Sequence, residues 1–225
     1  MHKRYKIDLH THSVISRDGG ITSGQYGSIL EKGVLDCIAI TDHNETKFAL
    51  ELAKRWGDKI IAGEEIMTLE GEMIGLFLQK TVAKNLTAKQ TAKLIHEQGG
   101  LVYIPHPFET LRSGLKNEAL ETIIDDIDII EVFNARSKWI GKSREALEFA
   151  EKNNKPIASS SDSHCALGMG SSFGLIDQIP TRKTLVDLLK NGSLQKEYAP
   201  LISYLCPMVN RIVNYFPSPF RRGLG

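Results

Sequence analysis

Three residues with metal-binding side chains, Asp8, His10 and His12, occupy alternate positions near the start of the chain. An extended segment directs every second side chain to the same face, so we expect these three to point the same way at the end of a short strand. Imidazole and carboxylate groups are common ligands of transition metals in proteins. The segment therefore predicts a metal site, with a pair of surface histidines as the alternative.

Further groups of potential ligands follow apolar runs later in the chain. They are Asp42-His43, Glu64-Glu65, His106 between Pro105 and Pro107, Asn134, and Asp162 with His164. A lone Asp-His pair would be weak support, since a core histidine with satisfied hydrogen bonds is the commoner case. The two prolines predict a rigid, extended path around His106. Because several groups recur at strand ends, they favour one shared site.

Short apolar runs alternate with helical patterns along nearly the whole chain. The predicted strands cover residues 5–9, 37–41, 59–62, 101–104, 127–132, 156–160 and 173–176, and a hairpin joins 66–69 to 73–78. The predicted helices cover residues 23–32, 45–56, 88–98, 117–125, 142–153 and 182–190, with Thr22, Thr87 and Thr181 as N-caps. This alternation predicts an α/β fold with parallel strands and right-handed crossovers.

Such a chain could form an open doubly wound sheet or a closed barrel. The potential ligands all follow strands, and in a barrel those strand ends meet on one face. We therefore predict a distorted TIM-like barrel over residues 1–180, with residues 181–225 as a helical extension packed on it in the same domain. The extension is expected to cross the barrel bottom. Three arginines and no acid follow Glu197, which leaves a basic-apolar membrane-surface or partner-binding tail from Glu197 onward as the alternative.

The bulk composition is that of one ordinary globular domain. The 225 residues are 41% hydrophobic and 24% charged, with a net charge of +1, so no extended nucleic-acid surface is predicted. No signal peptide and no apolar run of membrane-spanning length is evident. The cysteines are odd in number and scattered, at Cys37, Cys165 and Cys206. We therefore expect a cytoplasmic protein without a disulfide framework, in which Cys165 serves only packing.

These motifs, in this order, resemble those of the PHP (polymerase and histidinol phosphatase) metallohydrolase family over roughly residues 5–176. The resemblance implies a PHP-type (β/α)7 barrel that binds two or three divalent metal ions (Mn, Zn or Fe). It also implies hydrolysis of phosphate esters by a metal-activated hydroxide.

The family's metal ligands can be carried over residue by residue. The first site corresponds to His10, His12, Glu65 and Asp162, the second to Glu65 and His106 with Glu65 bridging, and the third to Asp18, His43 and His164. Glu64 is the register alternative to Glu65. Asn134 stands where many members have a histidine, and an amide oxygen is a weaker ligand for a transition metal. Asp18 lies in a Ser-Arg-Asp-Gly stretch similar to that of the small-molecule phosphoesterase branch.

Phosphate recognition and proton transfer need further residues. Arginine suits phosphate geometry, and the candidates are Arg136, Arg112 and Arg17. His43 or Asp18 could protonate the leaving oxygen. Asp42 is expected to orient a metal-bound imidazole.

The leading functional hypothesis is hydrolysis of a small phosphorylated metabolite or a nucleotide. The alternatives are 5'-3' exonuclease-type cleavage of short oligonucleotides, a histidinol phosphatase, a carbon–nitrogen hydrolase, and a binding protein with an inactive metal site. The sequence leaves the oligomeric state and the choice of metal open.

Overall fold

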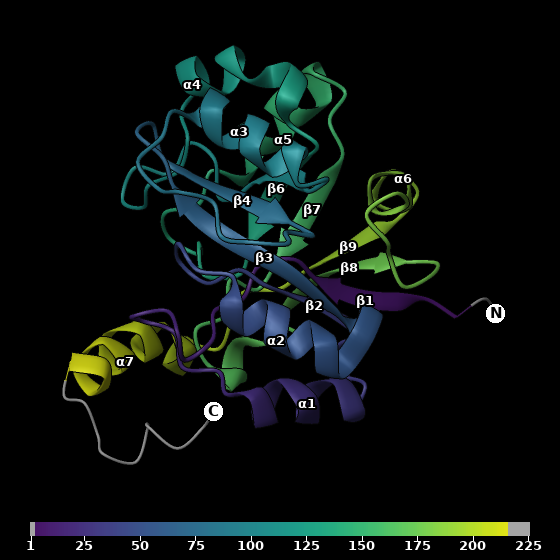
Figure 1. The fold of residues 1–225 in the computed structure, drawn as a ribbon, viewed down its shortest axis with the longest axis vertical. Coiled ribbons are helices and arrows are strands. Elements are labelled where there is room, and N and C mark those ends of the chain that lie inside the picture. Colours follow the sequence, from purple (N-terminus) through teal and green to yellow (C-terminus); the bar gives the residue numbers. More distant parts are fainter. Residues whose placement is uncertain (1–2, 216–225) are drawn as a thin grey trace.

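A computed structural model describes residues 3–215 and contains a single nine-stranded sheet within them (Figure 1). The strands are β1 (Tyr5–Asp8), β2 (Cys37–Ile40), β3 (Ile60–Met67), β4 (Glu72–Leu76), β5 (Leu101–Ile104), β6 (Ile129–Asn134), β7 (Ile157–Ser160), β8 (Ser172–Ile176) and β9 (Ser193–Lys196). Their order is β7-β6-β5-β4-β3-β2-β1-β8-β9. The α/β class is confirmed.

The sheet curls into a nearly closed barrel, which confirms the predicted architecture. The edges approach where the Ser159 hydroxyl of β7 donates to the carbonyls of Phe173 and Gln195, at 3.0 Å each. The expectation of parallel strands holds for β1–β2, β2–β3, β5–β6 and β6–β7. The other four ladders are antiparallel, because a hairpin supplies β4, β8 runs opposite to β1, and β9 runs opposite to β8.

Helices cover the outside of the barrel (Figure 1). They are α1 (Ser23–Glu31), α2 (Lys47–Trp56), α3 (Ala88–Glu97), α4 (Asn117–Thr122), α5 (Ser143–Lys152), α6 (Leu185–Lys190) and α7 (Cys206–Tyr215). The apolar faces of α1 to α6 form three buried clusters with the strands, and no residue of α7 belongs to these clusters. Thr22 and Thr87 are confirmed as N-caps that form capping boxes. Thr181 is not the N-cap of α6, because that helix begins at Leu185 and its N-cap is Thr184.

Two strands differ from the sequence prediction. Residues 59–62 and 66–69 were predicted as separate strands, but β3 runs through both. Gly63 lies where neighbouring strands approach closely, since a Cβ there would sit 2.9 Å from Thr41 Cγ2 and 3.0 Å from the Gly75 carbonyl. The glycine therefore marks close packing and not a strand end. The short, partly exposed β9 was not predicted, because its four residues carry little apolar pattern.

A disulfide joins Cys165 to Cys206, with Cα atoms 6.1 Å apart, so the expectation of unpaired cysteines was wrong. The two residues are 41 positions apart, and the sequence gives no sign that the turn before α7 returns to the end of β7. Cys37 is buried and free. The bond removes one of the arguments for a reducing compartment.

The segment before and through α7 lies on the face of the barrel opposite to the one predicted. The 3₁₀ turn η4 (Leu201–Leu205) leads into α7. Asn210 of α7 donates to the carbonyls of Asp18 and His164, in loops that follow β1 and β7. The helix therefore covers the carboxyl ends of the strands and not the barrel bottom. Of the tail from Glu197 onward, residues 216–225 lie outside the described residues. None of the helices described is long and apolar enough to cross a membrane.

Candidate metal centre

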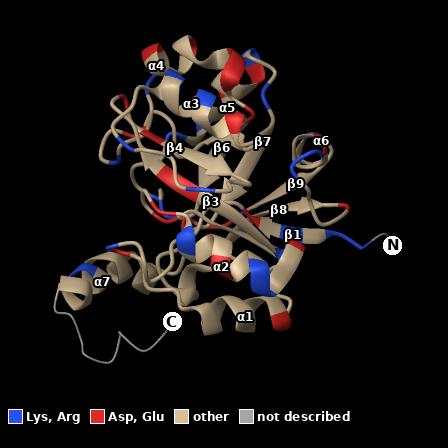
Figure 2. Cartoon of the chain, in the orientation of Figure 1, with Lys and Arg blue, Asp and Glu red and all other residues tan. Residues whose placement is uncertain are grey.

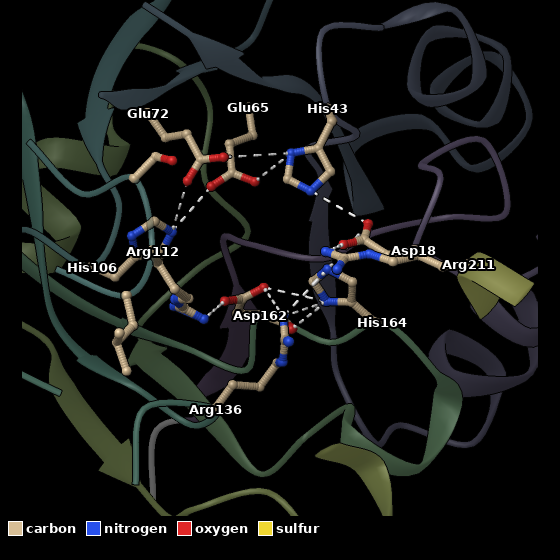
Figure 3. Close-up of a pocket in the computed structure, with 12 residues that line it drawn as sticks. Asp18, His43, Glu65, Glu72, His106, Arg112, Arg136, Asp162, His164 and Arg211 are labelled. Atoms are coloured by element: carbon tan, nitrogen blue, oxygen red, sulfur yellow. Dashed lines mark hydrogen bonds and ion pairs between the residues drawn. The ribbon is translucent and has the colours of Figure 1, made fainter. Parts of the chain in front are cut away.

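Potential metal ligands from six strands converge at one face of the barrel, and Figure 3 shows those that line the hollow there. His10 and His12 follow β1, His43 follows β2, Glu65 is in β3, Glu72 is in β4, His106 follows β5, and Asp162 and His164 follow β7. Their ligand atoms form overlapping groups of three within 4.8 Å of one another.

Glu65 lies at the middle of the cluster. Its Oε1 is 3.4 Å from His10 Nε2 and 3.1 Å from His106 Nε2. Its Oε2 is 3.3 Å from His12 Nε2 and 3.1 Å from His43 Nδ1. Each carboxylate oxygen thus faces a different pair of imidazoles, which is the geometry that a bridging ligand requires.

The structure also brings the other carried-over groups together. Asp162 Oδ1 lies 3.6 Å from His10 Nε2 and 3.5 Å from His12 Nε2, which completes the first predicted set. In the third set, Asp18 Oδ1 lies 3.5 Å from His43 Nε2 and 3.6 Å from His164 Nε2.

The donor set suits divalent transition metals. The Nε2 atoms of His10 and His12 face each other at 3.1 Å, so two ring nitrogens converge on one point. Asp18 Oδ1 is buried and has no hydrogen-bond partner among the described residues. Mixed imidazole and carboxylate donors with such unpartnered lone pairs fit Mn, Fe or Zn.

Electrostatics at this point favour a positive charge. Burial lowers the pKa of His10, but the charges of Asp162 and Glu65 outweigh burial and hold that pKa well above its usual value. A metal ion can replace a proton held in this way. For His164, burial and the nearby Arg136 charge lower the pKa well below its usual value, which leaves the neutral imidazole that binds metals.

Glu72 joins the cluster although its sequence position gave no sign of it. Its carboxylate lies 3.9 Å from His43 Nδ1 and 3.8 Å from His106 Nε2. Burial and the charge of Glu65 raise the pKa of Glu72 to about 7. The residue was read as part of the hairpin turn, but the turn ends before it and β4 directs it into the barrel mouth.

Glu131 is a second residue that the sequence prediction missed. It is fully buried, accepts hydrogen bonds from His10 Nδ1 (3.2 Å) and Tyr103 Oη (2.8 Å), and is also the acceptor for Ser160 Oγ. Burial raises the pKa of this carboxyl, but the hydrogen bond and charge of His10 outweigh burial and lower it to about 2. Glu131 therefore fixes the ring of His10 from behind.

Asp42 acts on the site through serines. It accepts hydrogen bonds from Ser13 N and Oγ and from Ser16 Oγ, and Ser16 Oγ lies 3.3 Å from His12 Nδ1. Asp42 thus orients the His12 imidazole, as expected, but does so through the Ser16 hydroxyl. It does not line the hollow in Figure 3.

Asn134, predicted as a metal ligand, already has hydrogen-bond partners within the protein. Both ends of the Asn134 amide have protein partners: the nitrogen donates to Glu131 and Asp162, and the oxygen accepts from Arg136 N. This favours an orienting role over the predicted ligand role.

Asp8 and Glu64 lie outside the ligand groups. Asp8 accepts from Ser161 N at 3.1 Å, and burial raises its pKa to about 7. Glu64 points away from the cluster and accepts from Val82 N at 2.8 Å. Glu64 and Glu65 are consecutive in β3 and point to opposite faces of the strand, so only Glu65 lies in the site.

A hollow of about 240 Å³ opens beside the ligand cluster, and three arginines line it (Figure 3). Arg112 Nη1 donates to Asp162 Oδ2 at 2.5 Å, and Arg136 Nη1 lies 3.3 Å from Asp162 Oδ1. Arg211 of α7, which the sequence prediction missed, donates to Asp18 Oδ2 at 2.8 Å. Arg17 is exposed and does not line the hollow.

Two site residues have unusual backbone conformations. His106 has φ 30° and Asp162 has φ 49°, in the left-handed region that non-glycine residues seldom adopt. The extended path predicted around His106 was therefore wrong, although the prolines do flank it. Such strain tends to persist at functional sites, where the surrounding structure enforces it.

Fold and site together define an α/β barrel with a cluster of metal-binding side chains at its carboxyl face. Comparisons with known proteins agree with this class. A family model described as PHP-associated (PHP_C) matches residues 142–194. The uncharacterized protein MJ0417 of Methanocaldococcus jannaschii is 38% identical over 181 residues, which cover 75% of this chain and 69% of that protein. The chain belongs to the PHP domain family.

Solved structures show the same fold at low sequence identity. A two-domain protein from Bacteroides vulgatus, containing a predicted PHP-like metal-dependent phosphoesterase, has a TM-score of 0.67 and 19% identity, over 93% of this chain and 70% of that one. The lesion-specific endonuclease PfuEndoQ from Pyrococcus furiosus has a TM-score of 0.61 and 16% identity, over 86% of this chain and 57% of that one.

Proposed function

We propose that this protein is a metal-dependent phosphoesterase that hydrolyses the phosphate ester of a small phosphorylated metabolite or a nucleotide. The observation that carries the proposal is that Arg112 and Arg136 line the same small hollow as members of the ligand cluster. Pockets for drug-sized ligands usually measure roughly 300–1,000 Å³. A hollow of about 240 Å³ therefore suits the phosphorylated end of a small molecule better than a nucleic-acid duplex.

The arginines bind the phosphate. Arg112 Nη2 and Arg136 Nε are buried and have no hydrogen-bond partner among the described residues. A buried donor without a partner is costly, and phosphate oxygens would satisfy both. Asp162 keeps both guanidinium groups oriented towards the hollow.

The metal ions would be held by the side chains that converge on Glu65 and Asp18. These side chains are His10, His12, His106, Asp162 and His164. Bound divalent ions activate water as a nucleophile at neutral pH and stabilise negative charge on phosphate oxygens. Two or three ions, of Mn, Fe or Zn, fit this set of donors.

His43 is best placed to protonate the leaving oxygen. Its side chain is 30% exposed at the edge of the hollow, whereas the other imidazoles of the cluster are at most 4% exposed. Asp18 Oδ1 lies 3.5 Å from its Nε2, so a carboxylate stands beside the ring and favours its protonated form. A His43→Asn variant should therefore lose more activity on alkyl phosphates than on p-nitrophenyl phosphate, whose leaving group needs no proton.

The test is phosphate release with added Mn²⁺ and after chelation. The panel contains sugar phosphates, histidinol phosphate, nucleotides, nucleoside bisphosphates and short oligonucleotides. We expect metal-dependent release from one class of small phosphomonoester. Asp162→Asn should abolish it, and Arg136→Met should raise KM about tenfold or more.

Arg17→Met is the matched control, because it removes an exposed guanidinium outside the hollow and should leave the kinetics unchanged. Cleavage of oligonucleotides alone would replace the proposal with a nuclease. No turnover by the folded, metal-loaded protein would leave a carbon–nitrogen hydrolase or a non-catalytic protein as the better account.

A further inference from the structure

Helix α7 attaches to the barrel through its polar side. Asn210 donates to the carbonyls of Asp18 and His164 at 2.9 Å, and Asn214 donates to the Arg17 carbonyl at 2.8 Å. Arg211 binds the Asp18 carboxylate. A surface helix normally does the reverse, burying its apolar stripe and exposing its polar one.

The apolar side of this segment faces outward. Seven aliphatic side chains of η4 and α7 are each 48–63% exposed: Leu201, Ile202, Leu205, Met208, Val209, Ile212 and Val213. They recur at helical spacing from Leu201 to Val213, and together they are called the α7 apolar face. Exposed apolar patches of this kind mark interaction sites in soluble proteins.

Aromatic and basic side chains border the α7 apolar face. Trp139 is 67% exposed, its ring centre lies 5.0 Å from that of Tyr204, and Lys138 Nζ lies 5.6 Å from the same indole. The sequence has no aspartate or glutamate from Tyr198 to Gly225 but has three arginines there. In Figure 2 the described part of α7 carries basic but no acidic colour.

We propose that the α7 apolar face docks on the surface of an anionic lipid membrane, with the helix lying in the plane of the interface. An aliphatic stripe with Trp139 and Tyr204 at its edge and Lys138 beside the indole is the pattern of interfacial helices. The ten residues of α7 are too few to span a bilayer.

Docking would hold the site close to the lipid surface. Arg211 both belongs to α7 and lines the hollow beside the ligand cluster. The disulfide at Cys206 ties the start of the helix to the loop that carries His164. The inference does not depend on the proposed activity, because it concerns where the protein binds and not what it cleaves.

The test is flotation of the full chain with vesicles of phosphatidylcholine alone or mixed with phosphatidylglycerol. We expect binding to the mixed vesicles that weakens with added salt. We also expect brominated lipid to quench the tryptophan fluorescence of the wild-type protein, and to quench that of Trp139→Phe less. Val209→Asp and Ile212→Asp should each weaken binding about tenfold or more. Leu69→Asp is the matched control, because it places the same charge on an exposed leucine of the β3–β4 turn.

Equal binding of the aspartate variants and the control would overturn the proposal, as would absence of binding by the wild-type protein. The proposal would also be overturned if the wild-type protein formed a dimer, did not bind vesicles, and became a monomer in Ile212→Asp. A second copy of the chain would then cover the face. Circular dichroism of each variant shows that a loss of binding is not a loss of folding.

Discussion

At the scale of single residues, the site depends on side chains that position others. His10 Nε2 faces the carboxylates of Glu65 and Asp162, whereas His10 Nδ1 forms a hydrogen bond with Glu131. This division fixes which nitrogen faces the cluster. The Glu131 carboxylate therefore sets the orientation of the His10 ring within the site.

Glu131→Gln should weaken metal binding about 10–100-fold, the usual cost of losing such an outer partner. The amide keeps the shape of the carboxylate but removes the charge that complements His10. Metal affinity is measured by titration calorimetry on protein stripped of metal. Tyr103→Phe, which removes one hydrogen bond to the same carboxylate, is the control and should have a much smaller effect. Unchanged affinity in Glu131→Gln would contradict the positioning role.

Glu64→Gln should stabilise the protein at alkaline pH. Burial raises the pKa of Glu64 from 4.5 to about 8, so between these values the folded state keeps a proton that the unfolded state has lost. The free energy of unfolding then falls by about 1.4 kcal/mol per pH unit across this window, and the neutral amide removes that loss. The gain should be largest at pH 8 and above and vanish below about pH 4.5.

Urea unfolding at several pH values measures this effect. Glu70→Gln is the control, since Glu70 also accepts a backbone N–H at 2.8 Å, from Ala88, but is exposed. A gain in Glu64→Gln that is the same at every pH would show that proton binding is not its cause.

Residue types and spacing were enough to predict most of the residues in the ligand cluster. A side chain that directly follows a parallel strand of a barrel lies at the barrel mouth. His10, His43 and Asp162 are of this kind. Glu72 and Arg211 were not predictable in this way. Glu72 depends on an antiparallel strand within the sheet, and Arg211 on a helix that folds back from a distant part of the chain.

At the scale of elements, the attachment of α7 is the feature that sequence patterns could not supply. Periodicity gave the strands and helices of the barrel to within a few residues because each buries its own apolar face. Helix α7 instead exposes its apolar side, so the expectation that it packs across the barrel bottom was wrong. The disulfide and the hydrogen bonds of Asn210 hold the helix where hydrophobic burial does not.

Cys206→Ser should therefore lower the free energy of unfolding by up to about 4 kcal/mol, the chain-entropy value for a loop of this length. Urea unfolding under oxidising conditions measures the loss. A reductant should bring the wild-type protein to the level of the variant and leave the variant itself unchanged. If the reductant has no effect on the wild-type protein, the bond does not contribute to stability.

At the scale of the whole molecule, the barrel gathers buried charges that it cannot neutralise by itself. Glu65, Glu72, Asp18 and Asp162 all lie at one face, and the carboxylates of Glu65 and Glu72 are close enough that one raises the pKa of the other. Burying like charges is costly unless cations pair with them. Divalent ions bound in this cluster would stabilise the entire fold, because the site is assembled only when the barrel closes.

Metal should therefore raise the melting temperature. A ligand that binds only the native state at 100 times its Kd contributes about 2.7 kcal/mol, or roughly 5–10 °C for a chain of this size. Differential scanning calorimetry of chelated protein with and without Mn²⁺ or Zn²⁺ measures the shift. His10→Ala should abolish most of it, whereas His96→Gln should retain it, since His96 pairs with Asp128 on the outside of the barrel. An equal shift in both variants would mean that the metal acts elsewhere, and no shift in the wild-type protein would mean that these ligands do not bind metal.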